Sequence, residues 1–186
     1  MRIVGGSLGG RVLRAPAGAA TRPTSEKVRE AVFGILHNRG DQVAGHVLDL
    51  FAGSGAVGIE ALSRGAKHAT FVDSAKPALL ATRGNLRDLG VDDRATIHAG
   101  DAIAFLKRPL ADGAAPWSLV FIDPPYASDL AVRAVQALPL TSLTGDAVIV
   151  IEHDRRNAPP EALGSLVRTD ERRYGDTLIS FYEVPT

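Results

Sequence analysis

The sequence predicts an α/β protein with a doubly wound, mostly parallel sheet. Five short apolar runs recur along the chain, at residues 46–51, 68–73, 95–100, 118–123 and 147–153. Segments with helical periodicity separate them, the clearest being residues 56–64, 75–89 and 129–138. Strands that alternate with helices form right-handed βαβ units, so these runs are expected to make a parallel sheet that helices cover on both faces.

The two ends of the chain depart from this alternation. Residues 2–13 (RIVGGSLGGRVL) predict a hairpin that turns at its glycines, and Thr24 or Ser25 then caps a helix. The apolar face of this helix is expected to consist of Val28, Val32, Phe33 and Leu36. At the other end, residues 165–184 predict an antiparallel hairpin that turns around Gly175 and closes the sheet edge.

The composition narrows the class of protein. With 186 residues, 45% of them apolar, the chain is long enough to bury one core. It contains no run of eighteen apolar residues and no signal-peptide pattern at its start, so we expect a cytoplasmic protein with no membrane contact. It has no cysteine and only five scattered histidines, so we expect neither disulfides nor a metal site. We also expect a monomer.

Charge is distributed unevenly along the chain. Residues 1–40 hold seven Lys or Arg against two Glu, a net charge of +5, whereas the formal net charge of the whole chain is zero and the remainder therefore carries −5. This asymmetry predicts a basic segment that meets a polyanion, although a solvated basic surface would explain the count equally well. We therefore divide the chain into a basic hairpin-helix extension, residues 1–40, and a main domain, residues 41–186.

A glycine-rich motif follows the first predicted strand. Residues 53–58 read G-x-G-x-x-G, and Asp73 ends the next strand twenty residues later, which is the pattern of dinucleotide-binding proteins. However, Asp49 lies directly before this loop, where its carboxylate would repel a pyrophosphate. It suits a positively charged ligand such as S-adenosylmethionine, which carries an ammonium and a sulfonium and no phosphate.

Two further acids fit the same cofactor. Asp73 can accept hydrogen bonds from both ribose hydroxyls, and Asp101, after the third strand, can accept from the adenine amine. Each acid also has a structural explanation, since Asp101 could be only a helix N-cap and Asp73 only a turn residue. Open α/β sheets bind their ligands at the carboxyl ends of the strands, so three acids at successive strand ends favour the cofactor interpretation.

The fourth strand ends in Asp123-Pro124-Pro125-Tyr126, a segment with little capacity for helix or sheet hydrogen bonds. An exocyclic amine of a nucleobase is a poor nucleophile, and two acceptors on its N–H groups would orient it and stabilise the charge that develops on it. The Asp123 carboxylate and the Pro124 carbonyl provide these acceptors, because proline fixes φ and supplies a carbonyl without an N–H. Tyr126 offers a face on which a flipped base can stack.

Six segments together resemble the RsmD family of bacterial ribosomal RNA methyltransferases, which make N2-methylguanine in small-subunit (16S) RNA. They cover most of the chain and read MRIVGGSLGGRVLRAP, TRPTSEKVREAVFGIL, VLDLFAGSGAVGIEALSRGA, FVDSAKPAL, VFIDPPY and YGDTLISFYE. The resemblance implies a Rossmann-like class I S-adenosylmethionine-dependent methyltransferase domain with a seven-stranded sheet and a reversed last strand. It also implies an N-terminal hairpin-helix extension that engages RNA, and ribosomal RNA as the partner, within the small subunit or its assembly intermediate.

The residues and the resemblance together give one candidate site. The predicted catalytic residues are Asp123, Pro124, Pro125 and Tyr126. The predicted cofactor-binding residues are Asp49, Phe51, Ala52, Gly53, Ser54, Gly55, Asp73, Asp101 and Ala102. The resemblance implies that the RNA-binding residues, some of them near the cofactor, are Arg2, Arg11, Arg14, Arg22, Thr24 and Arg29.

Four other functions remain open at this stage. An adenine-N6 methyltransferase acting on DNA or RNA would use the same Asp-Pro-Pro-Tyr segment. A protein glutamine methyltransferase would resemble it too, but with Asn in place of Asp123. The glycine motif alone also fits a nicotinamide-dependent oxidoreductase, and the basic extension fits a non-catalytic RNA-binding protein, which would leave the acids without a role.

Overall fold

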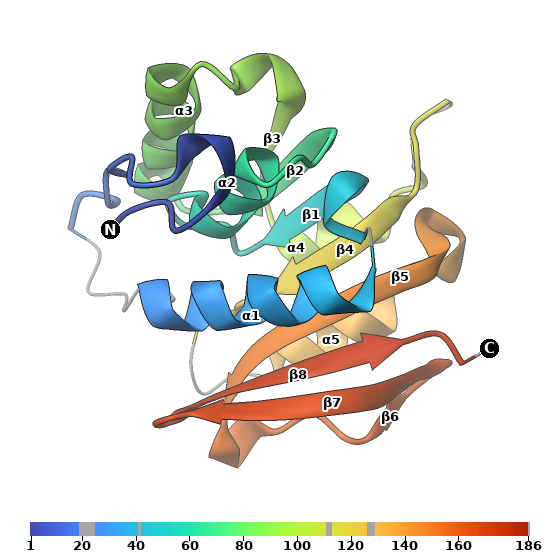
Figure 1. The fold of residues 1–186 in the computed structure, drawn as a ribbon. Helices are drawn as coiled ribbons and strands as arrows, with labels where there is room; N and C mark the ends of the chain where they lie inside the picture. The colour runs from blue at the N-terminus through green and yellow to red at the C-terminus, as the bar shows by residue number, and fades with distance from the viewer. Residues whose placement is uncertain (19–24, 41, 111–112, 126–128, 186) are drawn as a thin grey trace.

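The computed structural model describes residues 1–18, 25–40, 42–110, 113–125 and 129–185. In this part of the chain, eight strands form one sheet with helices on both of its faces (Figure 1). The strands are β1 (His46–Leu50), β2 (His68–Asp73), β3 (Ala95–Ala99), β4 (Trp117–Ile122), β5 (Leu143–Asp154), β6 (Ala162–Leu163), β7 (Leu166–Tyr174) and β8 (Thr177–Glu183). The α-helices are α1 (Glu26–Arg39), α2 (Ala56–Ser63), α3 (Lys76–Leu89), α4 (Ala102–Leu106) and α5 (Leu130–Ala137). Short 3-10 helices are η1 (Gly6–Leu8), η2 (Gln42–Ala44), η3 (Asp92–Arg94), η4 (Leu140–Ser142) and η5 (Arg155–Asn157).

The strand order is β3-β2-β1-β4-β5-β8-β7-β6, and β1 to β5 are parallel. Strand β8 runs antiparallel to β5 and forms a hairpin with β7, as expected. The doubly wound fold and the reversed last strand are thus confirmed. The expected number of seven strands was wrong, because Ala162–Leu163 adds a strand of two residues beside β7, too short for sequence periodicity to reveal.

Alternate residues of the central strands build two cores, one on each face of the sheet. On one face, Val47 and Phe121 pack with α1, α2 and α3. On the other, Leu48 and Ile122 pack with α4 and α5. This alternation is what a strand buried on both faces requires, and it explains why the central strands are apolar throughout.

The N-terminal segment packs against the first of these faces. An antiparallel bridge between Arg2 and Val12 forms the expected hairpin, with η1 at its turn. We call residues 1–14 the arm. Its side chains Ile3 and Leu13 belong to the same core cluster as Phe121 of the sheet. The arm thus shares a hydrophobic core with the main domain. The division of the chain into two functional parts at residue 40 stays a prediction.

Helix α1 begins where the sequence predicts. The Ser25 side chain accepts a hydrogen bond of 3.2 Å from the Val28 N–H, which satisfies one of the unpaired donors at a helix start, while Thr24 lies outside the described residues. All four predicted apolar side chains of the helix are buried. In the described ranges, no helix is long and apolar enough to cross a membrane, and no group of three or more acidic or histidine side chains is arranged to hold a metal ion.

Candidate active site

The predicted acids come from neighbouring strands at one edge of the sheet. Asp73 is the last residue of β2, Asp101 follows β3, and Asp123 follows β4. The order β3-β2-β1-β4 makes these strands adjacent, with β1 and its glycine loop between β2 and β4. Leu50 pairs with Ile122, the residue before Asp123, so the end of β4 lies beside the start of the glycine loop.

The loop between β1 and α2 has an unusual backbone. Phe51 has a φ of 61°, in the left-handed region that a residue with a side chain rarely adopts. Such a conformation costs on the order of 1–3 kcal/mol and is retained mainly at functional sites. Gly53 and Gly55 also have positive φ angles, of 56° and 76°.

The three glycines of the G-x-G-x-x-G motif have different roles. A Cβ atom on Gly58 would lie 2.3 Å from the Phe71 ring, and one on Gly55 would lie 2.9 Å from Thr82, so these two positions allow α2 to pack closely. A Cβ atom on Gly53 would meet nothing nearer than 4.0 Å. The space beside Gly53 and its left-handed backbone fit a ligand that approaches the loop.

Asp49 lies beneath this loop, with 2% of its surface exposed. Its carboxylate accepts a hydrogen bond of 2.9 Å from the Gly58 N–H in the first turn of α2. Burial raises the pKa of Asp49 to about 7, the hydrogen bond from Gly58 opposes this rise, and the nearby charge of Asp73 adds to it. Asp49 therefore lies behind the loop as a buried carboxyl group that becomes charged near neutral pH.

The Asp73 carboxylate holds the loop in position. Its two oxygens accept hydrogen bonds of 2.8 Å from the N–H groups of Gly53 and Ala75. A carboxylate has about four lone-pair positions, so both oxygens keep capacity for ribose hydroxyls. The shape of the loop and the predicted ribose contact thus depend on the same residue.

The remaining cofactor candidates follow β1 and β3. Asp101 is exposed and caps α4, where it accepts a hydrogen bond of 2.8 Å from the Ala104 N–H. The expected role as a helix N-cap is thus confirmed, and the contact of Asp101 with adenine stays a prediction. Ala102 and Ser54 are buried, whereas Ala52 is half-buried.

The Asp-Pro-Pro segment extends from β4 without regular secondary structure. Asp123 and Pro124 are half-buried and Pro125 is exposed. Both Asp123 and Pro125 make interactions with other parts of the protein. Tyr126 lies outside the described residues, so its stacking role stays a prediction.

The predicted RNA-binding residues fall into three groups. Arg2, Arg11 and Arg14 are exposed on the arm, and Arg14 makes a partly exposed ion pair of 2.5 Å with Asp88 of α3. Arg22 and Thr24 lie outside the described residues. Arg29 requires a correction, described next.

Arg29 is only 1% exposed and cannot reach an RNA phosphate from this position. Its guanidinium donates to the Arg2 carbonyl, and its Nε lies 3.9 Å from Oε2 of Glu60, which is fully buried on α2. Burial lowers the pKa of Arg29, and the charges of Glu60 and Glu26 oppose this effect. Arg29 is a structural residue that joins α1 to α2 and to the arm.

Sequence reasoning missed the residues that hold the arm and the loop in place. Glu60 accepts hydrogen bonds of 2.7 and 2.8 Å from the N–H groups of Val4 and Gly5, and Ser63 accepts one of 2.9 Å from the Leu8 N–H. The signal was available for Glu60, because it is a charged residue within the otherwise apolar helix segment AVGIEALS.

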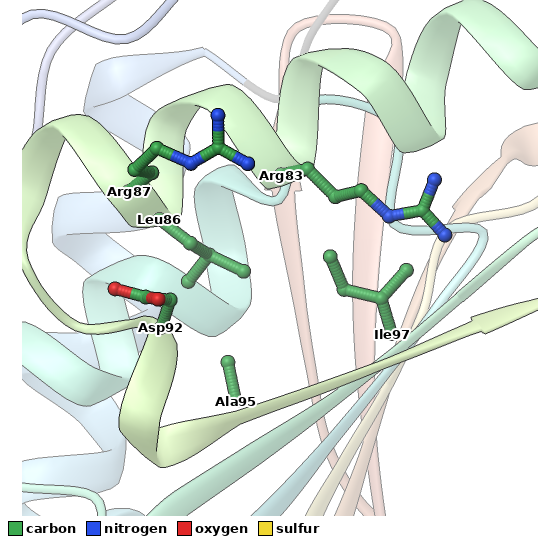
Figure 2. A pocket seen from close by; sticks show the side chains of 6 residues that line it. All are labelled: Arg83, Leu86, Arg87, Asp92, Ala95 and Ile97. Atoms are coloured by element: carbon green, nitrogen blue, oxygen red, sulfur yellow. The ribbon is translucent and has the colours of Figure 1, made fainter.

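A cavity of about 230 Å³ lies beside α3, away from the carboxyl ends of the strands (Figure 2). It is lined by Arg83, Leu86, Arg87, Asp92, Ala95 and Ile97. The two arginines are exposed residues of α3, and Arg83 extends over Ile97 of β3 (Figure 2). They are four residues apart on one helix, where like charges repel, so an anion bound between them would be favourable.

Comparison with known proteins identifies the family. The sequence profile described as conserved hypothetical protein 95 matches residues 1–183. Ribosomal RNA small subunit methyltransferase D of Escherichia coli strain K12 is 32% identical over 184 residues, which are 98% of this chain and 89% of that protein. The protein YlbH of Bacillus subtilis is 40% identical over 185 residues, 98% of both chains. A solved structure of the Escherichia coli protein yhhF has a TM-score of 0.81 at 30% identity and covers 100% of this chain and 98% of its own. The chain therefore belongs to the RsmD family of S-adenosylmethionine-dependent ribosomal RNA methyltransferases.

Proposed function

We propose that the protein transfers a methyl group from S-adenosylmethionine to the exocyclic N2 amine of a guanine in small-subunit ribosomal RNA. The observation that carries this proposal is the position of Asp123-Pro124 directly after β4, beside a glycine loop that Asp73 holds open. The name of the Escherichia coli relative, ribosomal RNA small subunit methyltransferase D, supports the substrate.

The residues present fit the cofactor. Gly53 leaves space for it, Asp73 has capacity for its ribose, and Asp49 places a carboxylate behind the loop near its positive charges. The cofactor supplies a methyl group on a sulfonium, which makes that methyl carbon electrophilic.

The protein's part in the reaction is to orient the amine. The Asp123 carboxylate and the Pro124 carbonyl accept hydrogen bonds from its two N–H groups and direct its lone pair at the methyl carbon. With the cofactor bound, the N–C bond would form as the C–S bond breaks, and the electron pair of the C–S bond would stay on sulfur. The amine becomes positively charged, Asp123 stabilises that charge, and the extra proton passes to water.

Transfer of labelled methyl to four substrates tests this function. They are small ribosomal subunits lacking the modification, naked ribosomal RNA, duplex DNA and total protein. Label in ribosomal substrates that digests to N2-methylguanosine is the expected result, and comparison of subunits with naked RNA shows whether assembly is required. N6-methyladenosine, or label only in DNA or protein, would overturn the proposed acceptor.

Cofactor binding is expected to depend on pH through Asp49. A bound cation favours the ionised carboxylate, so cofactor binding releases a proton while Asp49 is still partly protonated. With a pKa of about 7, the affinity for S-adenosylmethionine is expected to rise about tenfold from pH 6 to pH 8. Titration calorimetry across this range measures the effect, and Asp49→Asn should flatten it. An equal slope in that variant would show that another group titrates.

RNA binding is expected to use two parts of the basic surface, the arm and the α3 cavity. Arg11→Ala, and separately Arg83→Ala with Arg87→Ala, should weaken RNA binding and reduce its dependence on salt. Each lost phosphate contact lowers the slope of log K against log salt by roughly 0.7–0.9.

The matched control is Arg133→Ala, because Arg133 is also an exposed helical arginine but lies on α5, on the opposite face of the sheet. Its salt slope should equal that of the wild type. A filter-binding series from 50 to 300 mM salt, about the range where such contacts dominate, provides the measurement. If Arg133→Ala lowers the slope as much as the other variants, the basic surface has no preferred face.

A further inference from the structure

Asn85 of α3 connects the arm to the glycine loop. It is 1% exposed and lies between the two segments. Its Oδ1 accepts a hydrogen bond of 2.8 Å from the Arg14 N–H, and its Nδ2 donates to the carbonyls of Arg14, at 3.0 Å, and Ser54, at 2.9 Å. Both amide hydrogens and the amide oxygen of Asn85 therefore form hydrogen bonds.

The Ser54 hydroxyl also joins the loop to the arm, through a long hydrogen bond of 3.9 Å to the Met1 sulfur. Other side chains of α2 and α3 hold one of the two segments. Thr82, one turn earlier on α3, donates to the Gly53 carbonyl at 2.9 Å and holds only the loop. Glu60 and Ser63 hold residues 4–8 of the arm on α2. Asn85 bonds to both the arm and a loop carbonyl.

The planar amide gives this connection its rigidity. Its oxygen and nitrogen bond to the two backbone groups of Arg14 as a neighbouring strand would, while the second N–H on the same nitrogen bonds to Ser54. Rotation of the amide disrupts both bonds to Arg14 and the bond to Ser54. Because the group is buried, each lost bond leaves a polar atom without water to replace the partner.

We propose that Asn85 is a positioning residue that couples RNA binding by the arm to cofactor binding by the glycine loop. This inference rests on the proposed function. An RNA held by Arg11 and Arg14 fixes the end of the arm, which fixes Asn85 and through it the Ser54 carbonyl. The coupling is reciprocal, so a bound cofactor must strengthen RNA binding by the same factor.

The first test uses the wild-type protein without RNA. Hydrogen exchange of individual amides is measured with and without S-adenosylhomocysteine, which cannot react. We expect the Arg14 N–H, bonded to Asn85, to exchange at least about threefold more slowly with the ligand, and the Val4 and Gly5 N–H groups, bonded to Glu60, to change less. An unchanged Arg14 rate, or equal slowing of all three amides, would overturn the coupling.

The second test measures the coupling factor, the ratio of the RNA dissociation constants without and with S-adenosylhomocysteine. We expect a factor of about five or more in the wild type, within the range common for coupled sites, and about one in Asn85→Ala. Arg83→Ala is the matched control. It removes a proposed phosphate contact at the α3 cavity, away from the arm, and keeps the bonds of Asn85 to Arg14 and Ser54, so RNA binding weakens while the factor stays at the wild-type value.

A wild-type factor of one, or an unchanged factor in Asn85→Ala, contradicts the proposal. If Asn85→Ala does not fold, the exchange experiment on the wild type decides. Failure of the proposed function is distinguishable, because it would show as the wrong methylated product, which neither of these two measurements involves.

Discussion

Asp123→Ala is expected to slow methyl transfer severely while leaving cofactor binding intact. In the proposed mechanism, the carboxylate orients the amine and stabilises the positive charge that forms on it in the transition state. Removal of one such preorganised group costs about a hundredfold to a thousandfold in rate in comparable sites. Asp123 follows β4, whereas the loop that receives the cofactor is held by Asp73 and α3, so the dissociation constant of S-adenosylmethionine should change by less than about threefold. Single-turnover transfer and calorimetry measure the two quantities separately.

Two further variants separate the contributions of Asp123. Asp123→Asn keeps an acceptor oxygen but removes the charge, so an intermediate rate loss would assign part of the effect to charge stabilisation. Asp146→Ala removes an exposed acid from the opposite end of a strand, β5, and should have no effect. A rate for Asp123→Ala within tenfold of the wild type would exclude the proposed role of the carboxylate.

The fold could be predicted from the sequence because its signals are local. Buried parallel strands are continuous apolar runs and the helices between them show a different period, so all five parallel strands were placed to within a few residues of their observed bounds. Strand β6 escaped prediction because a two-residue strand has no period of its own. Its existence depends on pairing with β7, a tertiary effect.

Candidate site residues could be predicted only at the ends of strands. Asp73 and Asp123 became candidates because they end apolar runs, and the parallel topology confirms that both lie at the carboxyl ends of the strands, while their roles stay predictions. Asn85 could not be identified in this way. It lies in an amphipathic helix where a polar residue normally faces solvent, and the partners that bury it come from residues 14 and 54.

The misassigned role of Arg29 has a related cause. A charge count places Arg29 among the basic residues of the extension but does not say which face of α1 it occupies. Its position one residue after Val28 and three before Val32 puts it on the border of the apolar stripe. Glu60, its partner, is 31 residues further along the chain and on another helix, so the pair becomes visible only in the folded structure.

This buried pair leads to the largest expected effect on stability. Glu60→Ala removes the carboxylate that accepts hydrogen bonds from the backbone N–H groups of Val4 and Gly5 and from the Arg64 side chain. It also removes the negative charge that pairs with the buried Arg29. Breaking a buried ion pair from one side costs about 3–5 kcal/mol, so urea unfolding should show a loss of that size in the free energy of unfolding. Glu161→Ala is the matched control, because it breaks an ion pair with Arg168 in which Glu161 is 86% exposed, and it should cost at most about 1 kcal/mol.

A double variant tests whether the cost comes from the buried charge of Arg29. Arg29→Met with Glu60→Gln replaces the pair by neutral side chains of similar length, and the introduced amide keeps an oxygen for the arm's N–H groups. If the buried charge dominates, this double variant should be less destabilised than Glu60→Ala alone, because neither position then carries a charge in the core. A double variant that is at least as unstable would instead assign the stability to the hydrogen bonds from Val4 and Gly5. In that case the arm's attachment to α2, and not the neutralisation of Arg29, would be the reason for a carboxylate inside an apolar helix.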